Sequence, residues 1–164
     1  LLGKPAFIKL KMNSLSDYKM IDRLYDASRA GVKIQLIVRG ICCLIPGIPG
    51  MSDNIEAISI VDNLLEHSRI YIFGNDGTPE IYISSADLMT RNIDERVEVT
   101  CPIYDEEIKQ ELIDTFNIYW SGNVKVRIHS EDLSNKYRSS KEIEFRAQLK
   151  LYDYYRNKLE VIVE

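Results

Sequence analysis

Two residues of this sequence, Arg39 and His67, could act directly on a negatively charged group. Arg39 follows the apolar run 35–38 and precedes Gly40, which allows a ligand to approach the backbone closely. A guanidinium at the end of a strand could form paired hydrogen bonds with a phosphate. A structural role is the alternative, because an arginine in this position often pairs with a carboxylate or with a helix C-terminus.

His67 lies between Glu66 and Ser68, at the entry to a predicted strand, and Arg69 follows two residues later. A histidine can transfer a proton or attack phosphorus near neutral pH. A single histidine at a helix-to-strand junction can equally be structural. We therefore treat His67 as the candidate catalytic residue, and both His67 and Arg39 as candidate ligands of an anionic phosphate.

Further polar residues gather where predicted strands end, which is where open α/β sheets bind their ligands. Their cations, amides and hydroxyls suit phosphate oxygens, and they form a second tier of candidates: Lys11, Asn13, Arg69, Ser84, Ser85, Asp87, Arg91 and Asn92. An ordinary solvated turn or sheet edge is the alternative for each of them. We see no cluster of carboxylates that demands a metal ion, so no metal ligand is predicted.

The composition predicts one folded domain over residues 1–164. Hydrophobic residues make up 45% of the chain and charged residues 28%, as in globular proteins. The formal net charge of −4 argues against a nucleic-acid-coating protein, since that function needs many uncompensated cations. Any anion site must therefore be local.

The cysteines and apolar runs predict a cytoplasmic protein. The three cysteines, Cys42, Cys43 and Cys101, lack zinc-binding spacing and fit reduced thiols. The apolar runs are far shorter than the ~20 residues of a membrane-spanning helix, which leaves only peripheral association with a membrane open. The chain starts without Met, so we interpret its beginning as a cut from a longer protein.

The periodicity of the sequence predicts a mixed β-sheet flanked by α-helices. A strand at 6–12, a helix capped by Asp17 and ended by Gly31, and a strand at 32–38 form a βαβ unit with two parallel strands. Further strands are predicted at 69–73, 80–84, 96–99 and 124–128, with a hairpin turn at 74–77 and loops at 39–54 and 130–142. A helical stretch is predicted at 60–65, and a helix from 105 to 119 has Ile108, Leu112, Phe116 and Tyr119 on one face. The last predicted element is an amphipathic helix at 141–160, with Phe145, Leu149, Tyr152 and Tyr155 as its apolar stripe.

The order of the polar residues resembles one half of a phospholipase D-type site, where His-x-Lys precedes Gly-Ser-x-Asn. Arg69 stands in place of the lysine and Asp87 in place of the asparagine. Longer strings are similar to bacterial polyphosphate kinases: KMNSL at 11–15, LIVRGICCL at 36–44, LEHSRIY at 65–71 and YISSADLMTRN at 82–92. This resemblance extends from about Phe7 to Tyr155.

Resemblance to polyphosphate kinases implies the last, phospholipase D-like catalytic domain of a longer chain. Such enzymes move the terminal phosphate of ATP reversibly onto inorganic polyphosphate, with Mg²⁺. The resemblance assigns His67 to a second essential histidine and Arg39 to an arginine that contacts phosphate, while the phosphorylated histidine belongs to the preceding domain. It further implies ATP or ADP and polyphosphate as ligands, the remaining domains as partners, self-association of the whole enzyme, and an isolated domain that is inactive.

Two other functions remain open from the sequence. One is a phospholipase D-like phosphodiesterase, in which two copies of this half-site meet and His67 acts as nucleophile or acid. The other is a non-catalytic module that binds anions or holds an oligomer together.

Overall fold

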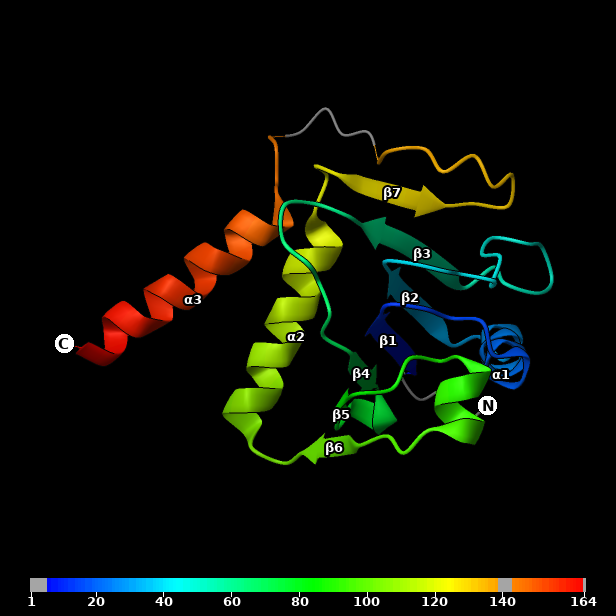
Figure 1. The fold of residues 1–164 in the computed structure, drawn as a ribbon, viewed down its shortest axis with the longest axis horizontal. Coiled ribbons are helices and arrows are strands. Elements are labelled where there is room, and N and C mark those ends of the chain that lie inside the picture. Colours follow the sequence, from blue (N-terminus) through cyan, green and yellow to red (C-terminus); the bar gives the residue numbers. More distant parts are fainter. Residues whose placement is uncertain (1–5, 139–142, 164) are drawn as a thin grey trace.

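A computed structural model describes residues 6–138 and 143–163 as one mixed sheet with helices on both faces (Figure 1). The strands are β1 (Phe7–Met12), β2 (Lys33–Val38), β3 (Ile55–Ile60), β4 (Ile70–Phe73), β5 (Glu80–Ser84), β6 (Thr100–Ile103) and β7 (Val126–His129). The α-helices are α1 (Tyr18–Arg29), α2 (Glu106–Ser121) and α3 (Ala147–Val163). A 3-10 turn at Asn75–Gly77 and a π-helical turn at Arg91–Glu95 complete the elements.

The described strands form a seven-stranded sheet in the order β6-β5-β4-β1-β2-β3-β7. The central strands β1, β2 and β3 are parallel, and every other pair is antiparallel. The predicted βαβ unit is therefore confirmed. Because β1 and β2 are parallel neighbours in register, with Met12 opposite Val38, the residues that follow them emerge at the same edge of the sheet.

Helix α1 covers one face of the central strands. Its N-terminus is fixed by Asp17, whose carboxylate accepts a hydrogen bond of 3.0 Å from the backbone N–H of Met20. It is followed by Gly31 at φ +88°, a backbone conformation that glycine adopts readily. Ile21 and Leu24 of the helix pack against Leu36 and other buried residues of β1, β2 and β3.

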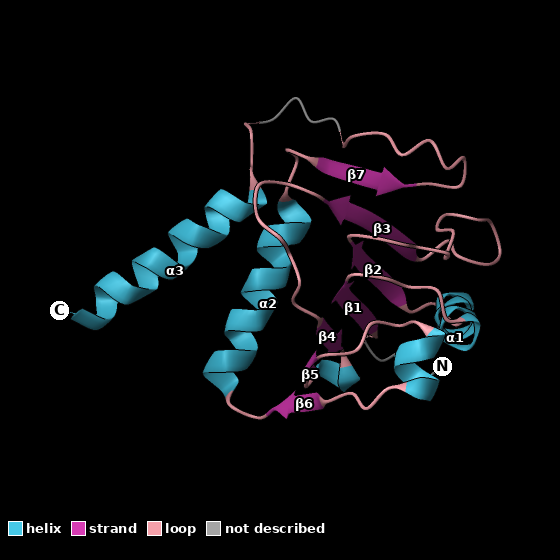
Figure 2. Cartoon of the chain, in the orientation of Figure 1, coloured by secondary structure: helices cyan, strands magenta, loops and turns pink. Residues whose placement is uncertain are grey.

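Helix α2 covers the opposite face, and α3 packs on α2 before it extends away from the sheet (Figure 2). Phe116 and Tyr119 of α2 pack with Ile37 and Ile58 of the sheet and with Ala147 at the start of α3. Leu36 and Ile37, which are adjacent, thus enter different core clusters, as the two-residue period of a strand requires. No helix in the described part of the chain is both long and apolar enough to span a membrane.

Two of the predicted elements are wrong. The helical stretch at 60–65 is absent, since 55–60 is the strand β3 and an irregular segment follows it. The apolar residues Val61, Leu64 and Leu65 recur at helical spacing, but all three are exposed, so this spacing does not mark a packed helix face. The predicted strand at 96–99 is also wrong, because the strand β6 begins only at Thr100. Val97 and Val99, which gave the alternating pattern, are exposed to solvent.

The last predicted helix is partly correct. Helix α3 begins at Ala147, after Phe145, while 139–142 lie outside the described residues. Leu149 and Tyr152 of the predicted stripe are exposed. Tyr155 of the stripe does contact α2, because its hydroxyl is hydrogen-bonded to Thr115. Leu151, which was not in the predicted stripe, is partly buried against the core. Of the predicted face of α2, Ile108 is half exposed, whereas the other three residues pack inward.

Candidate phosphate-binding site

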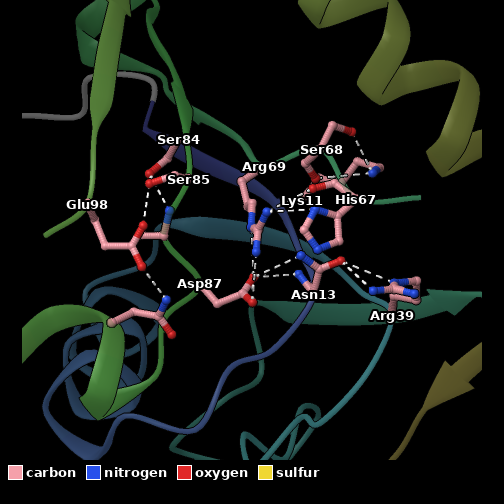
Figure 3. Close-up of polar contacts among 12 residues, drawn as sticks. Lys11, Asn13, Arg39, His67, Ser68, Arg69, Ser84, Ser85, Asp87 and Glu98 are labelled. Atoms are coloured by element: carbon pink, nitrogen blue, oxygen red, sulfur yellow. Dashed lines mark hydrogen bonds and ion pairs between the residues drawn. The ribbon is translucent and has the colours of Figure 1, made fainter. Parts of the chain in front are cut away.

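The site forms where β1 and β2 end side by side. Asn13 follows β1 and Arg39 follows β2, and both lie at the same edge of the sheet (Figure 3). The side-chain oxygen of Asn13 accepts hydrogen bonds from Nε of Arg39 at 3.1 Å and from Nη2 at 2.9 Å. The next residue, Gly40, passes close to the first strand, since a Cβ there would lie 2.9 Å from the carbonyl oxygen of Asn13. The parallel pairing of β1 and β2 therefore places Asn13 directly beside Arg39.

Asp87 connects Asn13 to Arg69. Its Oδ1 accepts from the backbone N–H of Asn13 at 2.8 Å, and the guanidinium of Arg69 approaches both of its oxygens at 3.2 Å. Burial alone would raise the pKa of Asp87, but the hydrogen bonds from Arg69 and Asn13 outweigh this effect and hold the pKa below its usual value. The two residues that depart from the phospholipase D pattern are therefore each other's partners.

His67 is exposed and lies beside this pair. Nη1 of Arg69 is 3.0 Å from Nδ1 of His67 and donates to the carbonyl oxygen of His67 at 3.1 Å. Figure 3 shows His67 between Arg69 and Arg39. The two main candidates from the sequence are thus brought together through a continuous network, Arg39–Asn13–Asp87–Arg69–His67.

Lys11 lies beneath the segment that carries His67 and is nearly fully buried. Its Nζ donates to the hydroxyl of Ser68 at 2.8 Å, lies 3.6 Å from a carboxylate oxygen of Glu66, and sits over the ring of Tyr119. Burial lowers the pKa of Lys11, and Glu66 partly opposes that shift. Lys11 therefore supports His67 from below, and its charge is already matched by a carboxylate.

The start of α3 holds the same segment in place. Gln148 accepts from the backbone N–H of Leu64 at 2.9 Å and donates to its carbonyl oxygen at 2.8 Å and to Glu66 at 2.9 Å. Just before it, Arg146 pairs with the buried carboxylate of Asp62. These contacts fix the irregular segment between β3 and β4, although sequence periodicity gave no indication of a role for Gln148 or Arg146.

A separate cluster contains Ser85, Asn92 and Glu98, with Ser84 beside it. Figure 3 shows Ser84, Ser85 and Glu98 on the other side of Asp87 from His67. Glu98 accepts hydrogen bonds from the hydroxyl of Ser85 and from the amide of Asn92, and these bonds lower its pKa. Ser84 is bonded to Thr100 at 2.9 Å. These groups are therefore occupied in joining β5 to the turn at 91–95. Arg91 is exposed, and its side chain makes no hydrogen bond or ion pair with the residues described.

The cations of the network differ in whether a carboxylate neutralises them. Arg69 is paired with Asp87 and Lys11 with Glu66. Arg39 is bound only by the neutral amide of Asn13, and within the described residues it has no carboxylate partner. Arg39 is therefore oriented but not neutralised, which is the state suited to binding an external anion.

A cavity of about 400 Å³ adjoins Arg39 and is bordered by Ser59, Arg127 and His129. Arg127 stacks on the ring of Tyr137 and, like Arg39, has no carboxylate partner among the described residues. Burial lowers the pKa of His129. Arg127 was not recognised from the sequence, because a single arginine in an edge strand carries no signal of its own.

Carboxylates do not gather here in the way that a magnesium ion requires. No group of three or more potential metal-ligating side chains occurs in the part of the chain that the structure describes. Asp87, Glu66 and Glu98 each already accept hydrogen bonds from neighbouring side chains. These residues therefore do not fit a Mg²⁺ site, since Mg²⁺ needs free, hard oxygen ligands.

Comparison with known proteins places most of the chain in one family. Residues 2–148 match the family model of the polyphosphate kinase C-terminal domain 2. The polyphosphate kinase of Vibrio cholerae is 51% identical over 156 residues, which cover 94% of this chain and 22% of that protein. The Escherichia coli K12 enzyme is 52% identical over 154 residues, with 93% and 22% covered. The chain thus spans about a fifth of the length of these relatives.

Solved structures show the same relationship. The polyphosphate kinase of Porphyromonas gingivalis superimposes with a TM-score of 0.93 at 46% identity, covering 97% of this chain and 24% of that one. A phospholipase D family member, Nuc from Salmonella typhimurium, superimposes with a TM-score of 0.59 at 12% identity, covering 79% and 85%, which shows the phospholipase D-like fold alone. The chain belongs to the polyphosphate kinase family, as its C-terminal, phospholipase D-like domain.

Proposed function

We propose that this chain supplies one half of a phosphoryl-transfer site that moves the terminal phosphate of ATP reversibly onto inorganic polyphosphate. The observation that carries the proposal is the unneutralised guanidinium of Arg39, held at one edge of the sheet in a network with His67. The about 50% identity to polyphosphate kinases supports ATP and polyphosphate as the anions.

The chemistry needs positioning and charge compensation more than covalent steps by this domain. Arg39 would bind a phosphate through the donors that Asn13 leaves free, and the adjoining cavity with Arg127 would accept neighbouring phosphates. His67 would donate a hydrogen bond or a proton to the transferring or leaving group, a contribution on the order of 10²- to 10⁴-fold for a well-placed acid or base.

Several parts of the reaction lie outside this chain in the proposal. The preceding domain of the longer enzyme would carry the phosphorylated histidine, and the whole enzyme would self-associate in the cytoplasm. Mg²⁺ would neutralise phosphate charge there, but we assign it no ligand in this chain because the described carboxylates are occupied. The isolated chain would bind anions without turnover.

The test is polyphosphate-dependent conversion of ADP to ATP by the full-length protein that contains this chain. We expect His67→Ala and Arg39→Gln to lose activity, and the matched control Arg29→Gln, on the exposed side of α1, to keep it. The 164-residue chain alone should be silent. Full activity of the His67→Ala enzyme would remove the proposed role of His67.

Two further measurements separate the rival functions. Hydrolysis of a chromogenic phosphodiester by a dimer of this chain would favour a phosphodiesterase. Salt-sensitive binding of polyphosphate, with no nucleotide product even from the full-length protein, would favour a non-catalytic anion-binding module.

A further inference from the structure

The Nδ1 atom of His67 is hydrogen-bonded to Arg69, a side chain that can only donate hydrogen bonds. Nη1 of Arg69 lies 3.0 Å from Nδ1 of His67 (Figure 3). An arginine guanidinium donates hydrogen bonds and has no lone pair with which to accept one. Nδ1 must therefore accept in this contact. The neutral imidazole then carries its proton on Nε2, for which the described residues offer no hydrogen-bond partner.

Arg69 is itself fixed in this orientation. Its Nε and Nη2 are each 3.2 Å from one oxygen of Asp87, and only 13% of its side chain is exposed. Asp87 in turn accepts the backbone N–H of Asn13 at the end of β1. The direction from which Nη1 approaches His67 is thus set by the sheet, because every link between β1 and the imidazole is a hydrogen bond or an ion pair.

We propose, on the basis of the function proposed above, that Arg69 is a positioning residue that holds His67 as the Nε2–H tautomer. His67 then serves as a hydrogen-bond donor to an oxygen of the phosphoanhydride substrate and not as a nitrogen nucleophile. No bond to phosphorus forms at His67, and the ring keeps its proton when the hydrogen bond is made.

A nucleophilic histidine would carry its proton on the other ring nitrogen. A ring that must present a lone pair at Nε2 needs its proton on Nδ1, which requires an acceptor such as a carboxylate at that nitrogen. In this chain a guanidinium occupies that place, and the carboxylate of Asp87 lies behind it. The arrangement therefore opposes a phosphodiesterase role in which His67 attacks phosphorus, and it favours a second donor beside Arg39.

Nitrogen-15 NMR of the chain labelled in its histidine rings tests the tautomer without any activity measurement. The spectra are recorded at about pH 8.5, above the ordinary histidine pKa of about 6.5. We expect His67 to show an unprotonated Nδ1 and a protonated Nε2, with its signals assigned by their loss in His67→Gln. His129, the other histidine, serves as an internal reference. A proton on Nδ1 of His67 would overturn the proposal, whatever the enzyme's activity.

Substitutions of Arg69 test whether this residue sets the tautomer of His67 and whether the tautomer affects activity. In Arg69→Met the ring should relax toward a mixture of tautomers, whereas Arg69→Lys, which keeps a donor, should preserve more of the Nε2–H form. In the full-length protein we expect kcat of Arg69→Met to fall on the order of 10- to 100-fold, as when an orienting partner of a metal-bound histidine is lost, with KM for polyphosphate nearly unchanged. An unchanged kcat together with a mixed tautomer would show that the orientation is irrelevant.

Discussion

The side-chain oxygen of Asn13 accepts two hydrogen bonds from the guanidinium of Arg39, at 3.1 and 2.9 Å. An amide oxygen carries no net charge, so Asn13 fixes the plane of the guanidinium and leaves its positive charge available. A carboxylate in the same place would neutralise it. The relationship links the end of β1 to the anion-binding capacity of the residue after β2.

Replacing Asn13 with alanine should release Arg39. We expect KM for polyphosphate in the full-length protein to rise about tenfold, because hydrogen bonds to charged groups contribute roughly 1.5–3 kcal/mol and part of the ordering is lost. The matched control is Asn117→Ala, which removes an exposed amide bonded to Lys9. An unchanged KM in Asn13→Ala, with the fold intact by circular dichroism, would contradict this role.

The ion pair of Arg69 and Asp87 predicts a pH-dependent stability. Asp87→Asn leaves Arg69 without its charge partner. This should lower the free energy of unfolding by about 3 kcal/mol, which is near the lower end of the cost of removing one partner from a buried ion pair. The exposed pair of Asp26 and Arg29 supplies the control, because Asp26→Asn should cost less than about 1 kcal/mol.

Acid should abolish the difference between wild type and Asp87→Asn. The folded pKa of Asp87 is lower than the ordinary aspartate value of about 3.9, so its stabilising contribution is present above that value and is lost as pH falls through the folded pKa. Urea unfolding at a series of pH values measures this. A difference that vanished already near neutral pH would show that another group is responsible.

His129 predicts a second loss of stability on acidification, which begins at a higher pH than that of Asp87. Burial lowers its pKa, so the folded state favours the neutral ring, and stability should fall as pH drops through the unfolded value of about 6.5. His129→Gln should remove this part of the acid sensitivity. His67→Gln, which still contains His129, should keep it. Equal pH profiles for wild type and His129→Gln in thermal unfolding would contradict the assignment.

The sequence was sufficient where the relevant physics is local or follows from strand order. Asp17 and Gly31 bound α1 as predicted, and the parallel order of β1 and β2 placed Asn13 beside Arg39. Whether these and the other candidate residues act on phosphate stays a prediction.

Sequence was insufficient where packing decides. The segment 60–65 has apolar residues at helical spacing, yet Val61, Leu64 and Leu65 are exposed and no helix forms there. The cluster of Ser85 with Glu98 uses hydroxyls that the sequence offered as phosphate ligands. The hydrogen bonds of Gln148 to Leu64 join residues far apart in the chain, which no periodicity can reveal.

Gln148 should matter to activity although it lies far from Arg39 along the chain. Gln148→Ala removes three hydrogen bonds to the segment that carries His67, two to Leu64 and one to Glu66. We expect the free energy of unfolding to fall by about 1–3 kcal/mol and kcat of the full-length protein to fall with it. The control Lys150→Ala, exposed on the same helix, should leave both unchanged. Loss of stability without loss of kcat at a temperature where the variant is folded would limit Gln148 to a structural role.

Arg127 should act on the polyanion rather than on the reacting phosphate. It borders the cavity next to Arg39 and has no carboxylate partner among the described residues, so its charge can attract further phosphates of a chain. Arg127→Gln should raise KM for long polyphosphate more than KM for ADP, and the effect should shrink at high salt, which screens the attraction. Arg23→Gln, an exposed arginine of α1, is the control for net charge. Equal effects of Arg127→Gln on both substrates, or an effect equal to that of Arg23→Gln, would remove Arg127 from the path of the polyphosphate chain.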